Sequence, residues 1–323
     1  MTQGQHDTTA PNGAALPRFS PRRELGRTGF VATQVGIGDL ADRKLSLETC
    51  VATLRRALDA GLNLVDTAPN YEEGYSEQIV GAALAGRRAG VFLIDKVDHL
   101  DRPVRPQVGE SLGRLGLPAV DLFVFHSVSA LEQYQQLVAP GGAWQELEAC
   151  RSEGRCRFIG LSSHDPRVLR AALERGGADV LMFPIGPFVD ARYTEEILPL
   201  AKARGVGSVC FKTFGAGKLL GDCSGYGQPL AERPRGKRSS GGVDAAEPLL
   251  PRLSVDECVA YTLTLDPDVA LLGMSFPNEQ DAALGAAARY QPLSSAQLSD
   301  VRERAQQAVL GKGPCWWNPA APE

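Results

Sequence analysis

The 323-residue sequence lacks the features that mark several classes of protein. It has no run of 18 or more apolar residues and no apolar segment near its start, so we expect neither a membrane span nor a secretory signal. Its net charge is only −4, which gives no reason to expect a nucleic-acid partner. No two of its seven cysteines form a C-x-x-C pair, which argues against a zinc or iron–sulfur centre and predicts reduced thiols in a cytoplasmic protein.

The composition is that of an ordinary globular protein with a core of normal size. Hydrophobic residues make up 43% of the chain and charged residues 22%. The length suits either two average domains or one large α/β barrel. Residues 1–22 are polar with Gly and Pro and predict a disordered leader, and residues 221–251, rich in Gly, Pro, Ser and Arg, predict a long mobile loop. We therefore expect a single domain over residues 23–323.

Short apolar segments alternate with segments of helical periodicity through most of the chain. A small hairpin is expected near residues 23–31, and eight strands then recur at intervals of about 28 residues, the length of one unit of a barrel. The expected strands span residues 35–38, 62–66, 91–95, 120–125, 158–161, 180–183, 206–211 and 269–273. Each is followed by a predicted helix, and one further amphipathic helix is expected at residues 295–310. This pattern favours a (β/α)8 TIM barrel.

A doubly wound open sheet is the competing fold. It would normally carry G-x-G-x-x-G after its first strand, whereas this chain has Gly38, Asp39 and Leu40 there. The later Gly-rich segment at residues 214–218 lacks the third glycine and is not a phosphate P-loop. The barrel is therefore the preferred interpretation.

Polar side chains follow the predicted strands, where the C-terminal ends of a barrel share one mouth. Four of them are ionisable groups on consecutive units: Asp66, Tyr71, Lys96 and His126. The others are Asp39, Ser162, Ser163, Lys212 and Ser275. Each residue alone has an ordinary structural explanation, such as a turn cap or a solvated loop charge, but four such groups at successive strand ends indicate a catalytic set.

The chemistry that suits this set is protonation of an oxygen that becomes an alkoxide. A free tyrosine titrates near pH 10, and a nearby ammonium lowers its pKa because it favours the phenolate. Asp66 would hold Lys96 charged, and His126 would orient a substrate oxygen or share the proton. Carbonyl reduction by hydride needs such a proton donor. The set offers no evident nucleophile, and one histidine with two acids is a thin set of ligands for a metal.

These residues lie in segments that resemble the aldo-keto reductase family over nearly the whole chain from about residue 23. The matching segments are RELGRTG, NLVDTAPNYEEGYSE, DLFVFHSVS, GRCRFIGLSSHDP and FKTFGAGKLL. The resemblance implies a barrel that binds NADP(H) or NAD(H) without a Rossmann domain. It implies Tyr71 as acid/base, Lys96 and Asp66 as the groups that tune it, and His126 as the residue that orients a carbonyl.

The resemblance also implies a set of cofactor contacts. Ser162 would hold the nicotinamide carboxamide, the Lys212–Gly217 loop would cradle the pyrophosphate, and the Gly273–Glu279 segment would receive the adenosine phosphate. The complete predicted cofactor set is Asp39, Ser162, Ser163, Lys212, Phe214, Gly217, Gly273, Ser275 and Glu279.

The sequence departs from the family at several of these positions. Ser163 replaces the usual Asn, Met182 replaces a Gln that contacts the nicotinamide, and Ile185 stands where an aromatic ring usually stacks, so that Phe183, Phe188 or Phe214 would have to supply the ring. Glu72 follows Tyr71 where Gly is usual, and we expect it to point to solvent. We interpret the Trp316–Trp317 pair as an apolar plug rather than a substrate contact.

The choice between NAD and NADP stays open in the sequence. Ser275 and Glu279 stand where Arg or Lys usually binds a 2′-phosphate, and a glutamate there favours NAD. Basic residues at positions 233–238 offer an alternative partner for a phosphate, and the family generally uses NADP.

The predicted function is transfer of a hydride between nicotinamide and a small aldehyde, ketone or sugar-like alcohol. A nicotinamide-binding sensor on the same fold is the alternative, because Met182, Ile185 and Ser163 alter the nicotinamide pocket. A lyase or isomerase that uses the cofactor transiently is a third. The substrate, the direction of reaction and the oligomeric state are not readable from the sequence.

Overall fold

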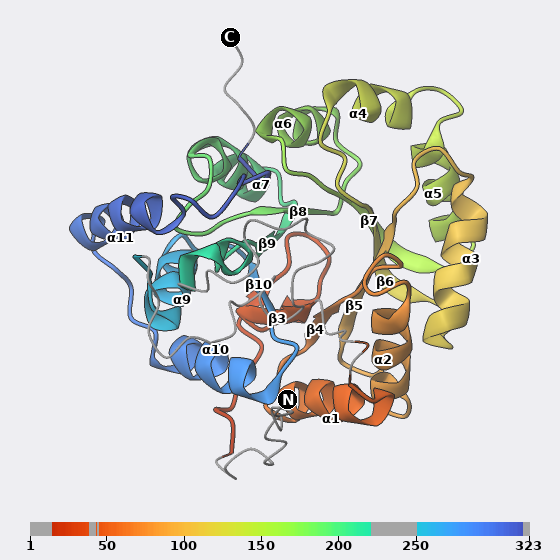
Figure 1. Cartoon of the computed structure of the whole chain (residues 1–323). Coiled ribbons are helices and arrows are strands. Elements are labelled where there is room, and N and C mark those ends of the chain that lie inside the picture. Colours follow the sequence, from red (N-terminus) through yellow and green to blue (C-terminus); the bar gives the residue numbers. More distant parts are fainter. Residues whose placement is uncertain (1–14, 39–42, 44, 221–250, 319–323) are drawn as a thin grey trace, which may run out of the picture.

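Eight parallel strands close into a barrel in the computed structural model, which describes residues 15–38, 43, 45–220 and 251–318 (Figure 1). Around the barrel the strands follow the order β10, β3, β4, β5, β6, β7, β8, β9. Their bounds are β3 Val35–Gly38, β4 Leu64–Asp66, β5 Phe92–Val97, β6 Val120–Phe125, β7 Cys156–Ser162, β8 Val180–Pro184, β9 Gly207–Phe211 and β10 Val269–Gly273. The predicted (β/α)8 barrel is confirmed, and the boundaries shift by at most two residues.

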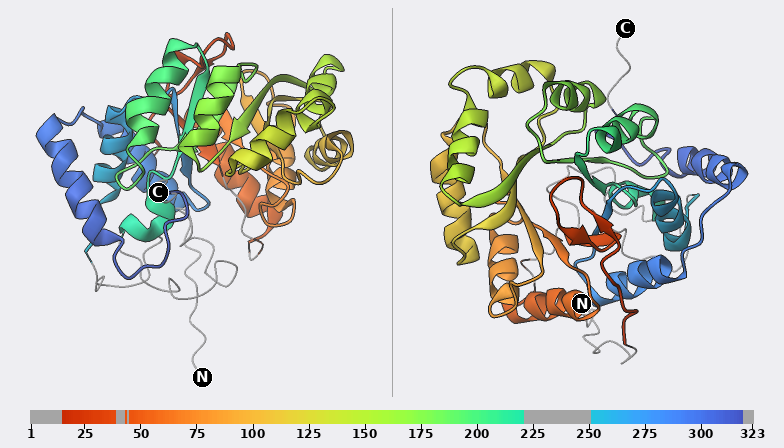
Figure 2. Two further views of the ribbon diagram at one scale, coloured as in Figure 1. Left: turned by 90° about the horizontal axis from the view of Figure 1, so that it is seen from above. Right: turned by 180° about the vertical axis from the view of Figure 1, so that it is seen from behind.

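Helices surround the barrel on its outside (Figures 1 and 2). They are α1 Leu47–Asp59, α2 Tyr75–Leu84, α3 Val104–Leu115, α4 Leu131–Val138, α5 Ala143–Ser152, α6 Pro166–Arg175, α7 Leu198–Ala203, α9 Val255–Thr264, α10 Pro277–Arg289 and α11 Ser295–Ala308. A π-helical turn, Tyr193–Ile197, leads into α7, and a 3-10 segment, Gly215–Leu220, follows β9. The expected additional C-terminal helix is α11, whereas α4 was not predicted.

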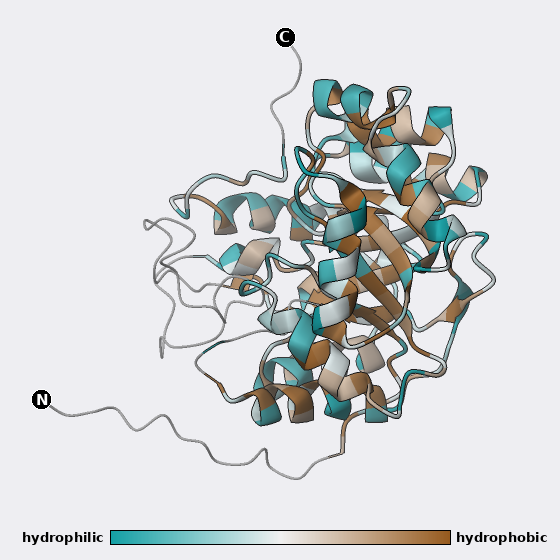
Figure 3. Ribbon diagram, turned by 90° about the vertical axis from the view of Figure 1, so that its right-hand side faces the viewer, coloured by the Kyte–Doolittle hydropathy of each residue, from teal (hydrophilic) through white to brown (hydrophobic). Residues whose placement is uncertain are grey.

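Two hydrophobic layers hold these elements together. Brown strands lie inside and teal residues gather on the outer faces of the helices (Figure 3), as expected when each strand has both faces buried. The inner layer fills the barrel with side chains that include Phe92, Leu122, Met182 and Val209. The outer layer joins the strands to the apolar stripes of the helices.

The N-terminal hairpin closes one end of the barrel. β1 (Arg23–Glu24) pairs antiparallel with β2 (Val31–Ala32), as predicted, and the hairpin lies across the barrel when it is seen from behind (Figure 2, right). Leu25 is fully buried among the inward side chains. The Phe30 ring lies 5.0 Å from that of Phe92, at the start of β5. The hairpin therefore covers the N-terminal ends of the strands and leaves their C-terminal ends for the site.

The described part of the predicted leader lies against the barrel. The amide of Phe19 donates to the Ala60 carbonyl at 2.7 Å, and that of Arg22 donates to the Ala32 carbonyl at 2.7 Å. Phe19 and Arg22, which fall within the leader predicted for residues 1–22, are thus bonded to the body of the protein. Residues 1–14, and nearly all of the loop predicted at 221–251, lie outside the described residues. No helix in the described ranges is long and apolar enough to cross a membrane.

Candidate active site

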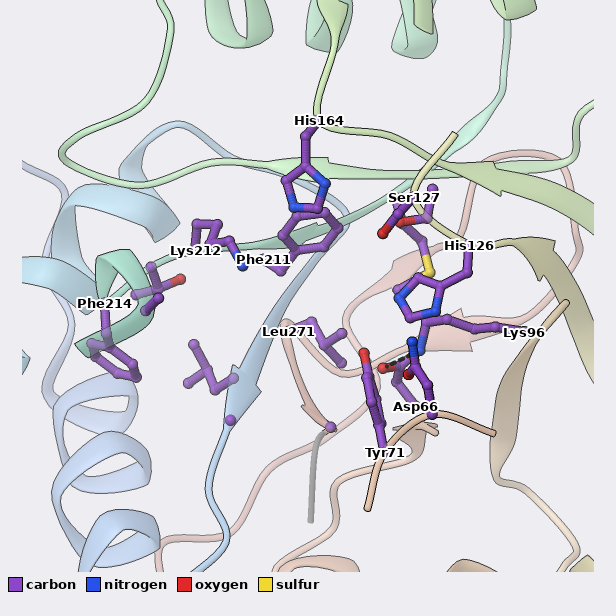
Figure 4. A pocket seen from close by; sticks show the side chains of 18 of the residues that line it. Asp66, Tyr71, Lys96, His126, Ser127, His164, Phe211, Lys212, Phe214 and Leu271 are labelled. Atoms are coloured by element: carbon purple, nitrogen blue, oxygen red, sulfur yellow. Dashed lines mark hydrogen bonds and ion pairs between the residues drawn. The ribbon is translucent and has the colours of Figure 1, made fainter. Parts of the chain in front are cut away.

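A cavity of about 350 Å³ opens at the C-terminal end of the barrel (Figure 4). Its walls come from residues at or just after most of the barrel strands, as the rule for such barrels leads one to expect. The predicted catalytic residues Asp66, Tyr71, Lys96 and His126 all line it. Among the described residues no cluster of His, Cys, Asp or Glu is arranged to hold a metal ion.

Lys96 is the buried centre of the predicted catalytic group. Its Nζ donates to both carboxylate oxygens of Asp66, at 2.7 and 2.8 Å, and to the Thr67 carbonyl at 2.7 Å. The two side chains are only 2% and 1% exposed. Burial acts to lower the pKa of Lys96, but the attraction of Asp66 and Tyr71 outweighs it and raises the pKa above its usual value. Lys96 therefore remains an ammonium inside the cavity wall.

Tyr71 lies directly over this ammonium. The Lys96 Nζ is 4.4 Å from the centre of the Tyr71 ring, and the interaction with Tyr71 is one of the causes that raise the lysine pKa. Because an interaction between two titrating groups is reciprocal, the ammonium favours the phenolate of Tyr71 by the same free energy. The ring also meets His126 edge to face, with 5.8 Å between ring centres.

The loop that carries Tyr71 is held in place by Ser76 and Glu77, at the start of α2. Thr67 Oγ1 donates to Ser76 Oγ at 2.8 Å, and Glu77, which is fully buried, forms an ion pair with Arg114. Glu72 has a left-handed backbone with φ of 50°; it is partly exposed and is not among the described residues that line the cavity.

His126 is held by a carboxylate that the sequence analysis did not single out. Its Nδ1 forms a hydrogen bond with Asp98 Oδ1, and Asp98 Oδ2 accepts from the Asn70 amide at 2.7 Å. The pKa of His126 is lowered, mainly by burial and also by repulsion from Lys96, against the opposing effect of Asp98. Asp98 lies two residues after Lys96 and directly after the end of β5. This position at a strand end is the feature of the sequence that could have marked it as a site residue.

The two adjacent serines after β7 have different roles. Ser162 lines the cavity, as predicted for a carboxamide contact. Ser163 is fully buried, and its hydroxyl bonds to the backbone of Asp165, accepting from the amide at 3.0 Å and donating to the carbonyl at 3.3 Å. Ser163 is thus used to shape the turn into α6 and is not among the described lining residues.

The aromatic face in the cavity comes from Phe211, at the end of β9. Ile185 is fully buried in the outer core, whereas Phe211 lines the cavity beside Met182. The ring of His164, next to the two serines, lies 5.2 Å from that of Phe211 (Figure 4). Of the rings that the sequence suggested as replacements, Phe214 also lines the cavity, whereas Phe183 and Phe188 are not among the described lining residues; Phe211, directly before Lys212, was not suggested.

The loop after β9 forms the opposite wall. Lys212 and Phe214 line the cavity, and Lys212 has a left-handed φ of 77°. Gly217 is not among the described lining residues; it has a φ of 86°, and its amide donates to the Phe214 carbonyl at 3.0 Å. Gly273 lines the cavity at the end of β10.

Two other predicted cofactor residues lie at the N-terminus of α10. Glu279 Oε2 accepts from the amides of Ser275, at 2.8 Å, and Phe276, at 3.2 Å, and so caps the start of α10 through its own side chain. Both predicted residues are buried and neither is among the described residues that line the cavity. Asp39 lies outside the described residues.

Comparison with known proteins assigns the chain to a family. Residues 33–303 match the model of the aldo/keto reductase family. The chain belongs to this family. Similar proteins include the NADH-specific methylglyoxal reductase of Escherichia coli, which is 28% identical over 61% of this chain and 66% of that protein. Another is the L-galactose dehydrogenase of Arabidopsis thaliana, which is 29% identical over 61% of this chain and 66% of that protein. The chain thus spans slightly less than two thirds of the length of these relatives.

Solved structures agree on the fold of this aldo/keto reductase. The holo form of an aldo-keto reductase from Bacillus halodurans superposes with a TM-score of 0.65 at 23% identity, covering 91% of this chain and 98% of that one. An aldo-keto reductase from Klebsiella pneumoniae, solved in complex with NADPH, gives 0.62 at 19% identity and covers 84% of this chain and 92% of that one.

The two adjacent tryptophans in the C-terminal tail of this aldo/keto reductase lie in different environments. Trp317 is fully buried, donates from Nε1 to the Phe188 carbonyl at 2.7 Å, and accepts from Tyr193 Oη at 3.1 Å through its own carbonyl. Trp316 is 40% exposed and lines the cavity, and its ring centre lies 5.2 Å from Lys212 Nζ. The interpretation as a plug thus holds for Trp317, whereas Trp316 is part of the wall.

His164 makes the stability of this protein sensitive to acid. Its Nε2 is shielded from solvent and has no partner among the described residues, and burial, with repulsion from Lys212 and His126, lowers its pKa well below the usual value. Below the unfolded pKa of about 6.5 the unfolded chain binds a proton that the folded chain excludes, so stability falls as pH falls, by up to about 1.4 kcal/mol per pH unit.

We therefore expect His164→Phe to lose less stability than the wild type between pH 7 and pH 5. Urea unfolding at both pH values measures the difference. His99→Phe, on a half-exposed loop, is the control that should follow the wild type. Parallel curves for the wild type and His164→Phe would contradict a neutral buried imidazole at this position.

Proposed function

We propose that this protein is an NAD(P)-dependent oxidoreductase that transfers a hydride between a nicotinamide cofactor and a small carbonyl or alcohol, with Tyr71 as the proton donor. The observation that carries this proposal is the buried Lys96 ammonium, bonded to Asp66 at 2.7 Å and lying 4.4 Å from the ring centre of Tyr71. Removing the charges of Lys96 and Asp66 from water costs free energy. The buried ammonium stabilises the phenolate that remains when a tyrosine has given its proton to an oxygen.

The chain's own residues supply the proton and its control. During reduction the Tyr71 hydroxyl donates to the oxygen of the substrate, and Lys96 stabilises the resulting phenolate because its charge is close and shielded from water. Asp66 keeps Lys96 in place through two hydrogen bonds. His126, which faces Tyr71 across the cavity, contacts the same substrate oxygen. In the reverse direction the phenolate accepts the proton of an alcohol.

The cavity has the surfaces that a nicotinamide dinucleotide needs. The bound cofactor would supply the hydride. Phe211 offers a flat apolar face, Ser162 a hydroxyl in the wall of the same cavity, and Lys212 a cation in the loop after β9. We propose that the nicotinamide lies against Phe211 and that the Lys212–Phe214 segment contacts the phosphates. Gly273 would leave room for the chain of the cofactor between β10 and this loop.

We further propose that NADH is preferred over NADPH. Glu279 already occupies the amides of Ser275 and Phe276, which at a helix N-terminus would be the natural partners of a phosphate, and its carboxylate repels one. The name of the E. coli relative, an NADH-specific methylglyoxal reductase, is in keeping with this preference.

We expect Glu279→Gln to narrow the preference for NADH by about fivefold, since the repulsion between one carboxylate and a phosphate that it removes corresponds to about 1 kcal/mol. Glutamine should keep the cap, because Gln297 Oε1 accepts from the amide of the N-cap residue Ser294 in the same way at the start of α11. Fluorescence titration with NADH and NADPH measures both affinities. Glu303→Gln, an exposed change on α11, is the charge-matched control, and an unchanged ratio in Glu279→Gln would rule out this source of selectivity.

The substrate class is a small aldehyde, ketone or sugar-like alcohol that fits between Tyr71 and Trp316. An indole face suits an apolar group or the flat side of a sugar ring. The relatives that reduce methylglyoxal or oxidise L-galactose, according to their names, fall in this range. We place the enzyme in the cytoplasm, on the scattered cysteines of the sequence, and propose only small-molecule partners.

The direct test is a panel of such carbonyls and alcohols with NADH and NADPH, followed by nicotinamide absorbance and by product analysis. Turnover with a net change in absorbance supports the proposal. Tight nucleotide binding without product would favour a sensor, the alternative that Met182 and the buried Ser163 suggest. Product without a net absorbance change would favour a lyase or isomerase.

A further inference from the structure

We propose that Asp98 is a positioning residue that fixes the proton of neutral His126 on Nδ1, so that the Nε2 lone pair, and not an N–H group, meets the substrate oxygen. Neutral His126 then accepts a hydrogen bond from a hydroxyl, and only protonated His126 donates one to a carbonyl. This inference rests on the proposed function for its catalytic consequence, but the position of the proton can be measured without any turnover.

The contacts of Asp98 leave it little freedom. Its side chain is 5% exposed, and each of its two oxygens has a partner. Oδ1 bonds to His126 Nδ1, and Oδ2 accepts from the Asn70 amide at 2.7 Å. Asp98 therefore connects the residue after β6 with the loop that carries Tyr71, and both sides of the cavity depend on its position.

The location of the proton follows from the chemistry of a carboxylate. An ionised carboxylate has only acceptor sites, so the ring nitrogen that bonds to it must carry a hydrogen. In a neutral imidazole the other nitrogen is then an acceptor. His126 lines the cavity and its ring points toward the same space as Tyr71 (Figure 4), so the unprotonated Nε2 is the atom available to a substrate.

The titratable groups around His126 come from three strands and the loops that follow them. Asp98 and Lys96 follow or end β5, Asp66 ends β4, Tyr71 lies in the next loop, and His164 follows β7. Burial, Lys96 and His164 disfavour the imidazolium, whereas Asp98 and Asp66 favour it. The net effect of these groups is to lower the pKa of His126. The ring is therefore neutral at pH 7 and gains its second proton only in acid.

Carbonyl reduction should consequently become faster as pH falls. At pH 7 a carbonyl oxygen receives a hydrogen bond from Tyr71 alone, while the lone pair of His126 faces it without a hydrogen. As His126 is protonated below its usual pKa of about 6.5, a charge-assisted donor is added, which corresponds to about a tenfold gain in kcat/KM.

Asp98→Asn should reverse the arrangement. Asparagine has one acceptor oxygen, which the Asn70 amide needs, and its amide group then donates to Nδ1. Neutral His126 must in that case carry its hydrogen on Nε2 and offer a donor to the cavity at every pH. We expect the acid-dependent gain in kcat/KM to shrink to less than about twofold in this variant, because no change of donor remains.

The first experiment reads the tautomer by NMR on protein labelled with 15N histidine. The chain has four histidines, and protonated and unprotonated ring nitrogens resonate far apart. His126→Asn identifies the signal. The proposal expects Nδ1–H in the wild type at pH 7.5 and Nε2–H in Asp98→Asn. An Nε2–H tautomer in the wild type, or no change in the variant, would overturn it.

The second experiment compares pH profiles of carbonyl reduction for the wild type, Asp98→Asn and Asp101→Asn. Asp101 is exposed in the same loop and makes the matched control, which should keep the wild-type profile. Equal profiles for the wild type and Asp98→Asn would reject the catalytic part of the inference. Absence of turnover with every carbonyl would instead count against the proposed function, and the NMR result would still decide the tautomer.

Discussion

Tyr71→Phe is expected to lower the rate of carbonyl reduction by about 10²- to 10⁴-fold while cofactor affinity stays within about twofold. The substitution removes only the hydroxyl that gives up the proton. The ring remains, and with it the contact to the Lys96 ammonium at 4.4 Å and the edge-to-face contact with His126. The loss should therefore appear in kcat and not in folding or in cofactor binding.

The measurement is a steady-state assay of the best substrate from the panel, together with a nucleotide titration of each variant. Tyr75→Phe provides the matched control, because it removes a tyrosine hydroxyl four residues away that donates to the Leu45 carbonyl at 3.0 Å and is not among the described residues of the cavity wall. Tyr75→Phe should retain activity. Reduction by Tyr71→Phe at the wild-type rate would sink the assignment of the proton donor.

Lys96→Met is expected to cost about 3–5 kcal/mol of unfolding free energy and nearly all activity. Asp66 is 1% exposed, and its two oxygens receive hydrogen bonds from Lys96. Methionine fills a similar volume but leaves the carboxylate buried without its counter-charge. The loss of activity has a separate cause, because the phenolate of Tyr71 is no longer stabilised.

Urea unfolding of three variants separates these effects. Lys96→Met with Asp66→Asn removes both charges and should regain most of the stability while activity stays low. Lys202→Met breaks an exposed pair with Asp266, 3.1 Å long, and should cost less than about 1 kcal/mol. A loss in Lys96→Met as small as that in Lys202→Met would show that the buried pair does not govern stability.

Much of the site was already readable from the sequence. A catalytic group that lies at a strand end is marked in the chain by an apolar run that stops at a polar residue, and Asp66 and His126 are both placed in this way. Lys96 is within β5 and not after it, since the strand continues to Val97. The side chain nevertheless reaches the cavity, because the alternation along the strand directs it inward.

The residues that escaped prediction depend on contacts between distant segments. Asp98 becomes informative only when the end of β5 is placed beside His126, after β6, and Asn70, after β4. Trp316 and Trp317 are adjacent in the chain, but the carbonyl of Phe188 and the hydroxyl of Tyr193 decide which of them is buried. No local pattern carries that information.

By itself the sequence determined the barrel, the hairpin and the four polar groups at successive strand ends, because the periodicity of apolar residues and the points where apolar runs stop are local properties. Only the tertiary structure decided which of two neighbouring residues at a strand end faces the cavity: Ser162 and not Ser163, Met182 and not Phe183. The physical reason is that successive side chains of a strand point to opposite faces. A shift of one residue would therefore move a side chain from the cavity wall into the hydrophobic core, or the reverse. That register is set by pairing with strands far away in the chain.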